Sequence, residues 1–130
     1  MSKRFKRRTR YIQLFFILMT IQYQNETFNL TTTNITTVLT IPTSAVGIIK
    51  TVQAVHNTAS NVDTDLFITK NGAGSDVQIS HDTLNKATVN MLTNTLNLEA
   101  GDAIKMKAST ANEITGVVSY ALIDRSQQNG

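Results

Sequence analysis

Short runs of alternating hydrophobic and polar residues follow one another along the chain after residue 19. In residues 34–42 the alternation ends at Pro42, which has no N–H to donate to a strand ladder. One face of this run carries Ile35, Thr37, Leu39 and Ile41. A period of two residues is typical of a strand with one face against a core. This segment is therefore predicted to be a strand that ends at Pro42.

Two longer segments carry hydrophobic residues on both faces. In residues 46–58, one face holds Val46, Ile48, Lys50, Val52 and Ala54, and the other holds Ile49, Thr51, Gln53 and Val55. In residues 112–126, Ile114, Val118, Tyr120 and Leu122 oppose Val117, Ala121 and Ile123. Strands that are covered on both faces show this pattern. We expect both segments to be central strands.

Turn residues divide the remaining chain into further strands. Residues 64–80 contain Asn71-Gly72 and Gly74 between two alternating runs, which predicts a hairpin. Residues 86–99 are less regular, because Asn90 and Asn94 fall on the face that also carries Leu92, Leu96 and Leu98. A bulge or an edge position would explain these polar residues.

A three-residue turn is predicted at Glu99-Ala100-Gly101. If Leu96 and Ile104 lie opposite each other and both face the core, the loop between their strands needs an odd number of residues. Gly101 would take the left-handed conformation of a type I turn with a G1 bulge. In this hairpin the solvent-facing and turn residues are Glu99, Asp102, Lys105 and Lys107. The glycine thus has a conformational explanation that requires no phosphate or metal.

The fold class that these patterns predict is all-β. Seven or eight strands with a turn about every ten residues favour one antiparallel β-sandwich, jelly-roll or immunoglobulin-like, with a slight preference for the jelly roll. The composition agrees, since the 130 residues include 20 Thr and 12 Asn but one Pro and no Cys. Residues 19–130 are expected to form this single domain.

Residues 1–18 differ sharply from the rest and are interpreted as a basic and apolar leader or arm. Six of the twelve basic residues lie in the first ten positions, and residues 19–130 hold six basic and nine acidic residues. The apolar run from Tyr11 to Ile21 is too short to span a bilayer. Three interpretations stay open: a secretory signal without a clear cleavage site, a basic arm for nucleic acid or an acidic partner, and translation that starts at Met19.

The metal sites that the sequence suggests are incomplete. Asn61, Asp63 and Asp65 copy the start of a calcium loop, but Leu66 and Gly72 stand where that loop needs Gly and Glu. Two histidines, His56 and His81, lack the spacing of a zinc pair and are expected in loops or on the surface. We predict no metal-binding residue and no cofactor.

Catalytic and modification motifs are equally unsupported. No Ser occupies a nucleophile elbow, and any pair among nine acidic residues can be drawn as a glycosidase site. Three N-glycosylation sequons, at Asn25, Asn29 and Asn34, are about as many as chance gives for this Asn, Ser and Thr content. The acidic body and its few aromatic residues also argue against specific nucleic-acid binding. The chain is expected to be no enzyme.

A family resemblance appears from Gly47 to Asp124. The stretches "IIKTVQAVHNT", "VDTDLFITK" and "NLEAGDAIKMKASTANEITGVVSYALID" resemble small β-sandwich virion proteins of tailed bacteriophages. The "LEAGD" turn is also similar to the penultimate hairpin of trimeric jelly rolls of the tumour-necrosis-factor and complement type. Both resemblances imply the same architecture.

The phage resemblance implies a non-enzymatic building block of the virion that decorates the head or forms part of a fibre or tail. Its implied partners are other copies of itself, as a homo-oligomer for which we expect a trimer, and other virion proteins. A membrane partner is expected only if the leader is a signal. The alternative is a secreted or surface-tethered adhesion module that binds carbohydrate, although the chain has no Trp for a stacking platform.

Overall fold

The computed structural model describes residues 21–124, which contain nine strands joined by loops. The strands are β1 (Ile21–Leu30), β2 (Thr36–Thr40), β3 (Ala45–His56), β4 (Val62–Thr69), β5 (Val77–Leu84), β6 (Ala87–Asn90), β7 (Leu96–Leu98), β8 (Ala103–Ala108) and β9 (Ile114–Asp124). The predicted leader, residues 1–18, lies outside the described residues. No helix within residues 21–124 is long and apolar enough to cross a membrane.

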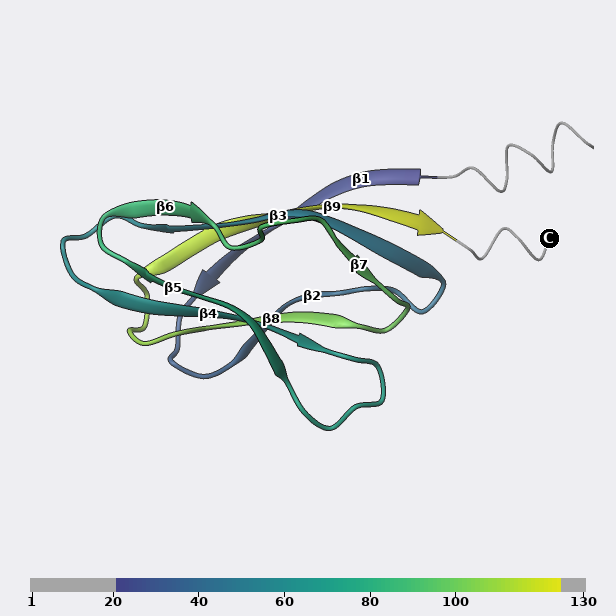
Figure 1. Ribbon diagram of the computed structural model, residues 1–130, viewed down its shortest axis with the longest axis horizontal. Helices are drawn as coiled ribbons and strands as arrows, with labels where there is room; N and C mark the ends of the chain where they lie inside the picture. The colour runs from purple at the N-terminus through teal and green to yellow at the C-terminus, as the bar shows by residue number, and fades with distance from the viewer. Residues whose placement is uncertain (1–20, 125–130) are drawn as a thin grey trace, which may run out of the picture.

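The strands form two antiparallel sheets that pack face to face (Figure 1). Sheet A has the order β1-β9-β3-β6, with β7 also paired to β3, and sheet B has the order β2-β8-β4-β5. Most successive strands alternate between the two sheets, and β6 and β7 share one edge position. An immunoglobulin-like sandwich keeps its first two strands in one sheet, whereas here β1 and β2 lie in different sheets. The predicted all-β sandwich is confirmed, and its strand order is that of a jelly roll.

The core lies between the sheets and is filled by the inward residues of both. Its largest fully buried side chains include Ile49, Ile114, Leu66, Ile104 and Met106. Each such side chain contributes about 1.5–3 kcal/mol through removal from water. Both segments that were expected to be central are confirmed, because β3 lies between β9 and β6 while β9 lies between β1 and β3.

A β-bulge in β3 changes the predicted faces of that strand. Its register with β9 shifts between Ile49 and Thr51, so the buried positions are odd-numbered before the shift and even-numbered after it. Ile48 and Val52 therefore lie on opposite faces, although simple alternation placed them together. The extra residue, Lys50, is exposed.

The predicted hairpin around Glu99-Ala100-Gly101 is wrong. β7 pairs with β3 in sheet A, and β8 pairs with β2 and β4 in sheet B, so Leu96 and Ile104 are not ladder partners. The turn itself is present: the N–H of Asp102 donates to the carbonyl of Glu99 (3.1 Å), and Gly101 has φ +82°. The turn carries the chain from one sheet to the other.

The two other loop regions behave as the sequence indicates. β4 and β5 form the predicted hairpin, and Gly72 between them has φ +79°. Residues 86–99 break into the short edge strands β6 and β7. Asn90 stabilises the end of β6, because its Oδ1 accepts hydrogen bonds from the N–H groups of Val52 (3.1 Å) and Leu92 (3.2 Å).

Candidate functional site

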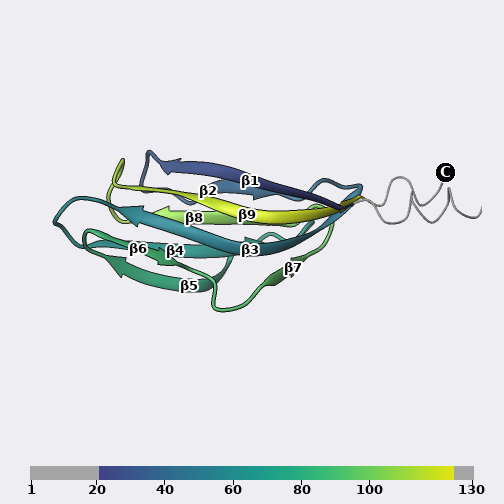
Figure 2. The same cartoon turned by 90° about the horizontal axis from the view of Figure 1, so that it is seen from above.

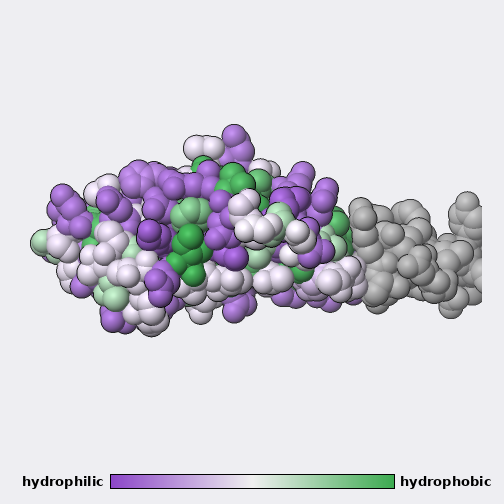
Figure 3. All heavy atoms as spheres, turned by 90° about the horizontal axis from the view of Figure 1, so that it is seen from below, coloured by the Kyte–Doolittle hydropathy of each residue, from purple (hydrophilic) through white to green (hydrophobic). Residues whose placement is uncertain are grey.

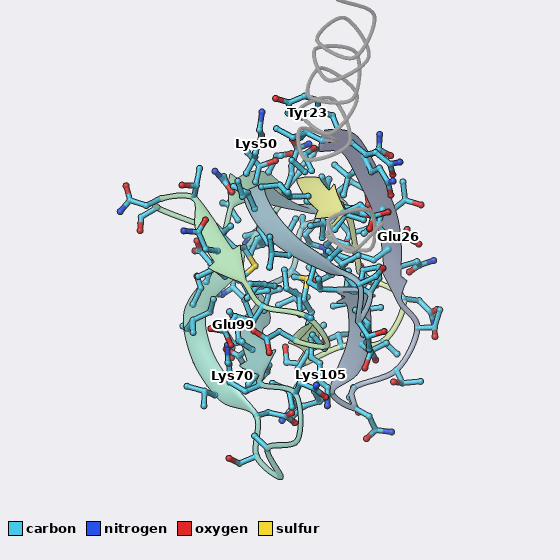
Figure 4. All side chains as sticks on the ribbon, turned by 90° about the vertical axis from the view of Figure 1, so that its right-hand side faces the viewer. Tyr23, Glu26, Lys50, Lys70, Glu99 and Lys105 are labelled. Carbon is cyan, nitrogen blue, oxygen red and sulfur yellow. The ribbon has the colours of Figure 1, made fainter. Side chains whose placement is uncertain are left out.

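A cluster of ionic groups lies at the end of the sandwich where the 99–102 turn meets the loop after β4. Asp102, only 1% exposed, accepts hydrogen bonds from the N–H groups of Asn71 (3.0 Å) and Glu99 (2.9 Å). The Nζ of Lys70 lies 2.5 Å from its Oδ2 and 3.4 Å from Oε2 of Glu99. Figure 4 shows Lys70 and Glu99 directed toward one another. The sequence placed Asp102 on the solvent face, and the structure corrects this.

The charges of this cluster favour a structural role, in which one carboxylate holds two loops together. We call Lys70, Asn71, Glu99 and Asp102 the clamp. Burial acts to raise the pKa of Asp102, but the hydrogen bonds from Lys70, Asn71 and Glu99 outweigh it, so the pKa lies below its ordinary value. The hydrogen bond to Asp102 raises the pKa of Lys70. A lysine held protonated in this way is neither a nucleophile nor a general base at neutral pH.

A shallow hollow of about 370 Å³ opens beside the clamp. Its walls are formed by β3 (Val46 to Ile48), by Leu98 and Ile123, and by Lys70 and Glu99. The walls thus combine aliphatic side chains with one ion pair whose groups already bind each other. Such a surface suits a contact with a protein segment better than a chemical reaction.

The acidic residues of the incomplete calcium motif are occupied by neighbouring side chains. Asp63 Oδ1 accepts from the hydroxyl of Thr83 (2.6 Å), and Asp65 Oδ1 lies 2.5 Å from Nδ1 of His81. Asn61 Oδ1 accepts from the amide of Asn85 (2.9 Å). Within residues 21–124 no three His, Cys, Asp or Glu side chains are grouped as a metal site would need.

The two histidines differ in environment. The side chain of His81 is 53% exposed on β5, as expected for a surface residue, and its hydrogen bond to Asp65 raises its pKa. His56 is 1% exposed, so the expectation of a loop or surface position is wrong. Its ring nitrogens lie 3.1 Å from the carbonyl oxygen of Glu113 and 2.8 Å from that of Ser60. Both contacts tie loops to the end of the sandwich.

The outer face of sheet A carries an exposed aromatic residue that the sequence did not single out. Tyr23 on β1 is 71% exposed, and Nζ of Lys50 lies 4.5 Å from the centre of its ring (Figure 4). Ile21, on the same strand and face, is 46% exposed. The bulge that exposes Lys50 brings this cation over the ring, a contact between strands that are not neighbours.

Sheet B exposes both polar and hydrophobic side chains, with Val77 56% and Ile79 42% exposed on β5. Seen from the side of this sheet, hydrophobic side chains occur as small spots among hydrophilic ones (Figure 3). Two ion pairs lie on this sheet, His81 with Asp65 and Lys105 with Asp76 (3.1 Å). The sequon residues Asn25, Asn29 and Asn34 are exposed elsewhere, on β1 and in the loop before β2.

Comparison with known proteins gives similarity at the level of fold. No protein-family model matches the chain, and no curated protein matches it. A chain in the acidic stable capsid structure of Helicobacter pylori bacteriophage KHP30 is similar with a TM-score of 0.52 and 11% identity. The match covers 82% of this chain and 90% of that chain.

Two further solved structures are similar more weakly. The virus-like particle of extra small virus from the giant freshwater prawn Macrobrachium rosenbergii matches with a TM-score of 0.40 and 16% identity, over 78% of each chain. The Eiger tumour necrosis factor from S. frugiperda matches with a TM-score of 0.40 and 8% identity, over 78% of this chain and 92% of that chain.

Proposed function

We propose that this protein is a non-enzymatic structural component of a bacteriophage virion, which decorates the capsid or forms part of a fibre or tail. The observation that carries the proposal is the jelly-roll strand order, together with the similarity in fold to a chain of the KHP30 bacteriophage capsid structure. That similarity covers 82% of this chain and 90% of the matched chain, so the sandwich corresponds to nearly the whole of that chain.

The chemistry of the described residues supports a structural role. The ionic groups of the clamp bind one another, and so do the two ion pairs on sheet B, His81 with Asp65 and Lys105 with Asp76. Repeated copies of one surface protein meet through a small number of interface types. We therefore propose self-association and contacts with other virion proteins, with three copies as the expected number.

The leader has its own place in this proposal. Residues 1–18 combine six positive charges with an apolar stretch, and the first strand of the sandwich begins at Ile21. We propose that they are a segment separate from the sandwich, either an arm on the particle or a part missing from the mature chain. Sequencing the N-terminal peptide of the mature protein distinguishes the two.

Particles purified on a density gradient from the source culture test the role directly. Isotope-labelled peptides from β3 and β9 measure how many copies of the chain each particle holds. We expect many equivalent copies that stay with the particle peak through repeated gradients. A chain that is absent from the particles, or that is secreted with a processed N-terminus, would contradict the proposal and favour an adhesion module.

A further inference from the structure

β1 is a long open edge. All ten of its residues pair with β9 without any shift of register, and no other strand within residues 21–124 pairs with it. Figure 2 shows β1 along one margin of sheet A. The unpaired side of such a strand presents N–H and C=O groups that another strand can bind.

The other edges of the sandwich carry features that discourage pairing. β2 has five residues and a register shift, and β5 has a register shift against β4. β6 and β7 are strands of four and three residues that share one edge. β1 has neither a shift nor any Pro, Gly, Lys or Arg. Because edge strands without these features readily pair with another chain, β1 is the edge suited to a partner.

The hydrogen bonds of β3 establish which groups of β1 are unpaired. The N–H of Val52 donates to Asn90 (3.1 Å), and its carbonyl accepts from Met91 (2.8 Å), so both face β6. Val118, opposite Val52 on β9, consequently directs its own groups toward β1, where it pairs with Glu26. Since the direction alternates along a strand, the even-numbered residues of β1 face β9. The odd-numbered residues, Asn25 among them, face the open side.

The sequence of β1 restricts how two copies can pair. An antiparallel partner must place odd-numbered residues opposite odd-numbered ones, because directly opposed side chains share a face. Among two-fold registers, those centred on Asn25 and on Glu26 give the greatest overlap. Centring on Glu26 opposes two like charges, whereas centring on Asn25 places Glu26 opposite Gln24 and Tyr23 opposite Thr27.

We propose that β1 pairs antiparallel with β1 of a second copy of this chain, with the two-fold axis at Asn25, so that sheet A continues across both subunits. The inference deepens the proposed function and rests on it for the expectation that copies meet. A two-fold contact does not close a ring of three, so a trimer would need a further interface.

Cross-linking of the full chain tests the register. The chain has no cysteine, so each single-cysteine variant reports one site. In the proposed pair the two Asn25 Cα atoms lie about 5.5 Å apart, within disulfide range. The two Thr27 Cα atoms lie roughly 14 Å apart. We expect Asn25→Cys to form a covalent dimer under mild oxidation at least about tenfold faster than Thr27→Cys. Equal rates, or no dimer from either variant, would overturn the proposal.

A second pair of variants tests the backbone contact by native mass spectrometry of the full chain. Asn25→Pro removes an N–H that faces the open edge and leaves the ladder with β9 intact, whereas Asn25→Ala keeps that N–H. We expect even-numbered assemblies built on the β1 pair from the wild type and Asn25→Ala, namely dimers or, with a three-fold interface as well, hexamers. We expect Asn25→Pro to give assemblies of half that size, with circular dichroism confirming that its sheets are retained. Wild-type monomers or trimers without dimers, or the same assembly for all three, would overturn the proposal. These measurements use isolated chains, so their failure is distinguishable from absence of the chain in particles.

Discussion

The Nζ of Lys70 lies 2.5 Å from Oδ2 of Asp102, and this pair joins the loop after β4 to the turn that leads into β8. The same carboxylate binds the N–H groups of Asn71 and Glu99. One buried side chain thus holds the turn through which the chain passes from sheet A to sheet B.

Asp102→Asn is expected to lower the free energy of unfolding by about 1–3 kcal/mol, because buried donors lose a charged acceptor. Glu99→Gln is the control, since its carboxylate is 82% exposed and contributes at most about 1 kcal/mol through Lys70. Urea unfolding followed by circular dichroism measures both. Equal effects of the two substitutions would show that Asp102 is not the centre of the clamp.

The contribution of His81 to the stability of the fold depends on pH, and the direction of its pKa shift gives the sign. Its folded pKa is raised above the ordinary 6.5, so it binds a proton more tightly in the folded state. Its contribution to stability is complete below about pH 6.5 and is lost as the pH rises through the folded pKa. We expect His81→Gln to destabilise the protein more at about pH 5 than at about pH 9 in urea unfolding. A difference that is larger at the alkaline pH would contradict the ion pair with Asp65.

Thr64 is fully buried on β4, and its Oγ1 has no hydrogen-bond partner within the described part of the chain. Thr64→Val keeps the shape of the side chain and removes the unpaired hydroxyl, so it should stabilise the protein by about 1–2 kcal/mol. Thr40→Val, at an exposed position of β2, serves as the control and should change little. A thermal-unfolding midpoint that falls for Thr64→Val would indicate that the hydroxyl is satisfied in solution.

Alanine substitutions at Gly72 and Gly101 distinguish the cost of a left-handed backbone from the cost of a steric clash. Gly101 and Gly72 both have positive φ, but a Cβ at Gly101 would lie 2.5 Å from Cγ of Asn71, whereas a Cβ at Gly72 meets no atom within 4 Å. Gly72→Ala is expected to cost about 1–2 kcal/mol from the left-handed conformation alone. Gly101→Ala should cost about 1–3 kcal/mol more, because Asn71 must also move. If both substitutions lower the free energy of unfolding equally in urea, the side chain of Asn71 moves aside without cost.

Most strands after residue 34, and the faces of β9, could be predicted because burial repeats every two residues there, whereas β1 was not predicted. The alternation at Ile114, Val118, Tyr120 and Leu122 matches the inward face of β9. The same pattern could not identify the partners of β7. Leu96 faces the core from sheet A and Ile104 faces it from sheet B, so both show the alternation that neighbours in one sheet would show.

The residues that the sequence misplaced depend on contacts between distant parts of the chain. Asp102 looks like a turn residue until the donors of Lys70 and Asn71, about thirty positions away, are brought to it. For His56 a local signal existed, since it follows Val52 and Ala54 at even spacing on the buried face of β3. The bulge at Lys50 concealed this face, because it shifts the alternation by one residue.

Electron cryomicroscopy of particles purified from the source culture would show whether this chain is a part of the virion. We expect density at symmetry-related positions of the particle that fits the two sheets of residues 21–124, with β1 at a subunit boundary. Particles whose shell, fibre and tail density is accounted for entirely by other chains would contradict the proposed role in the virion.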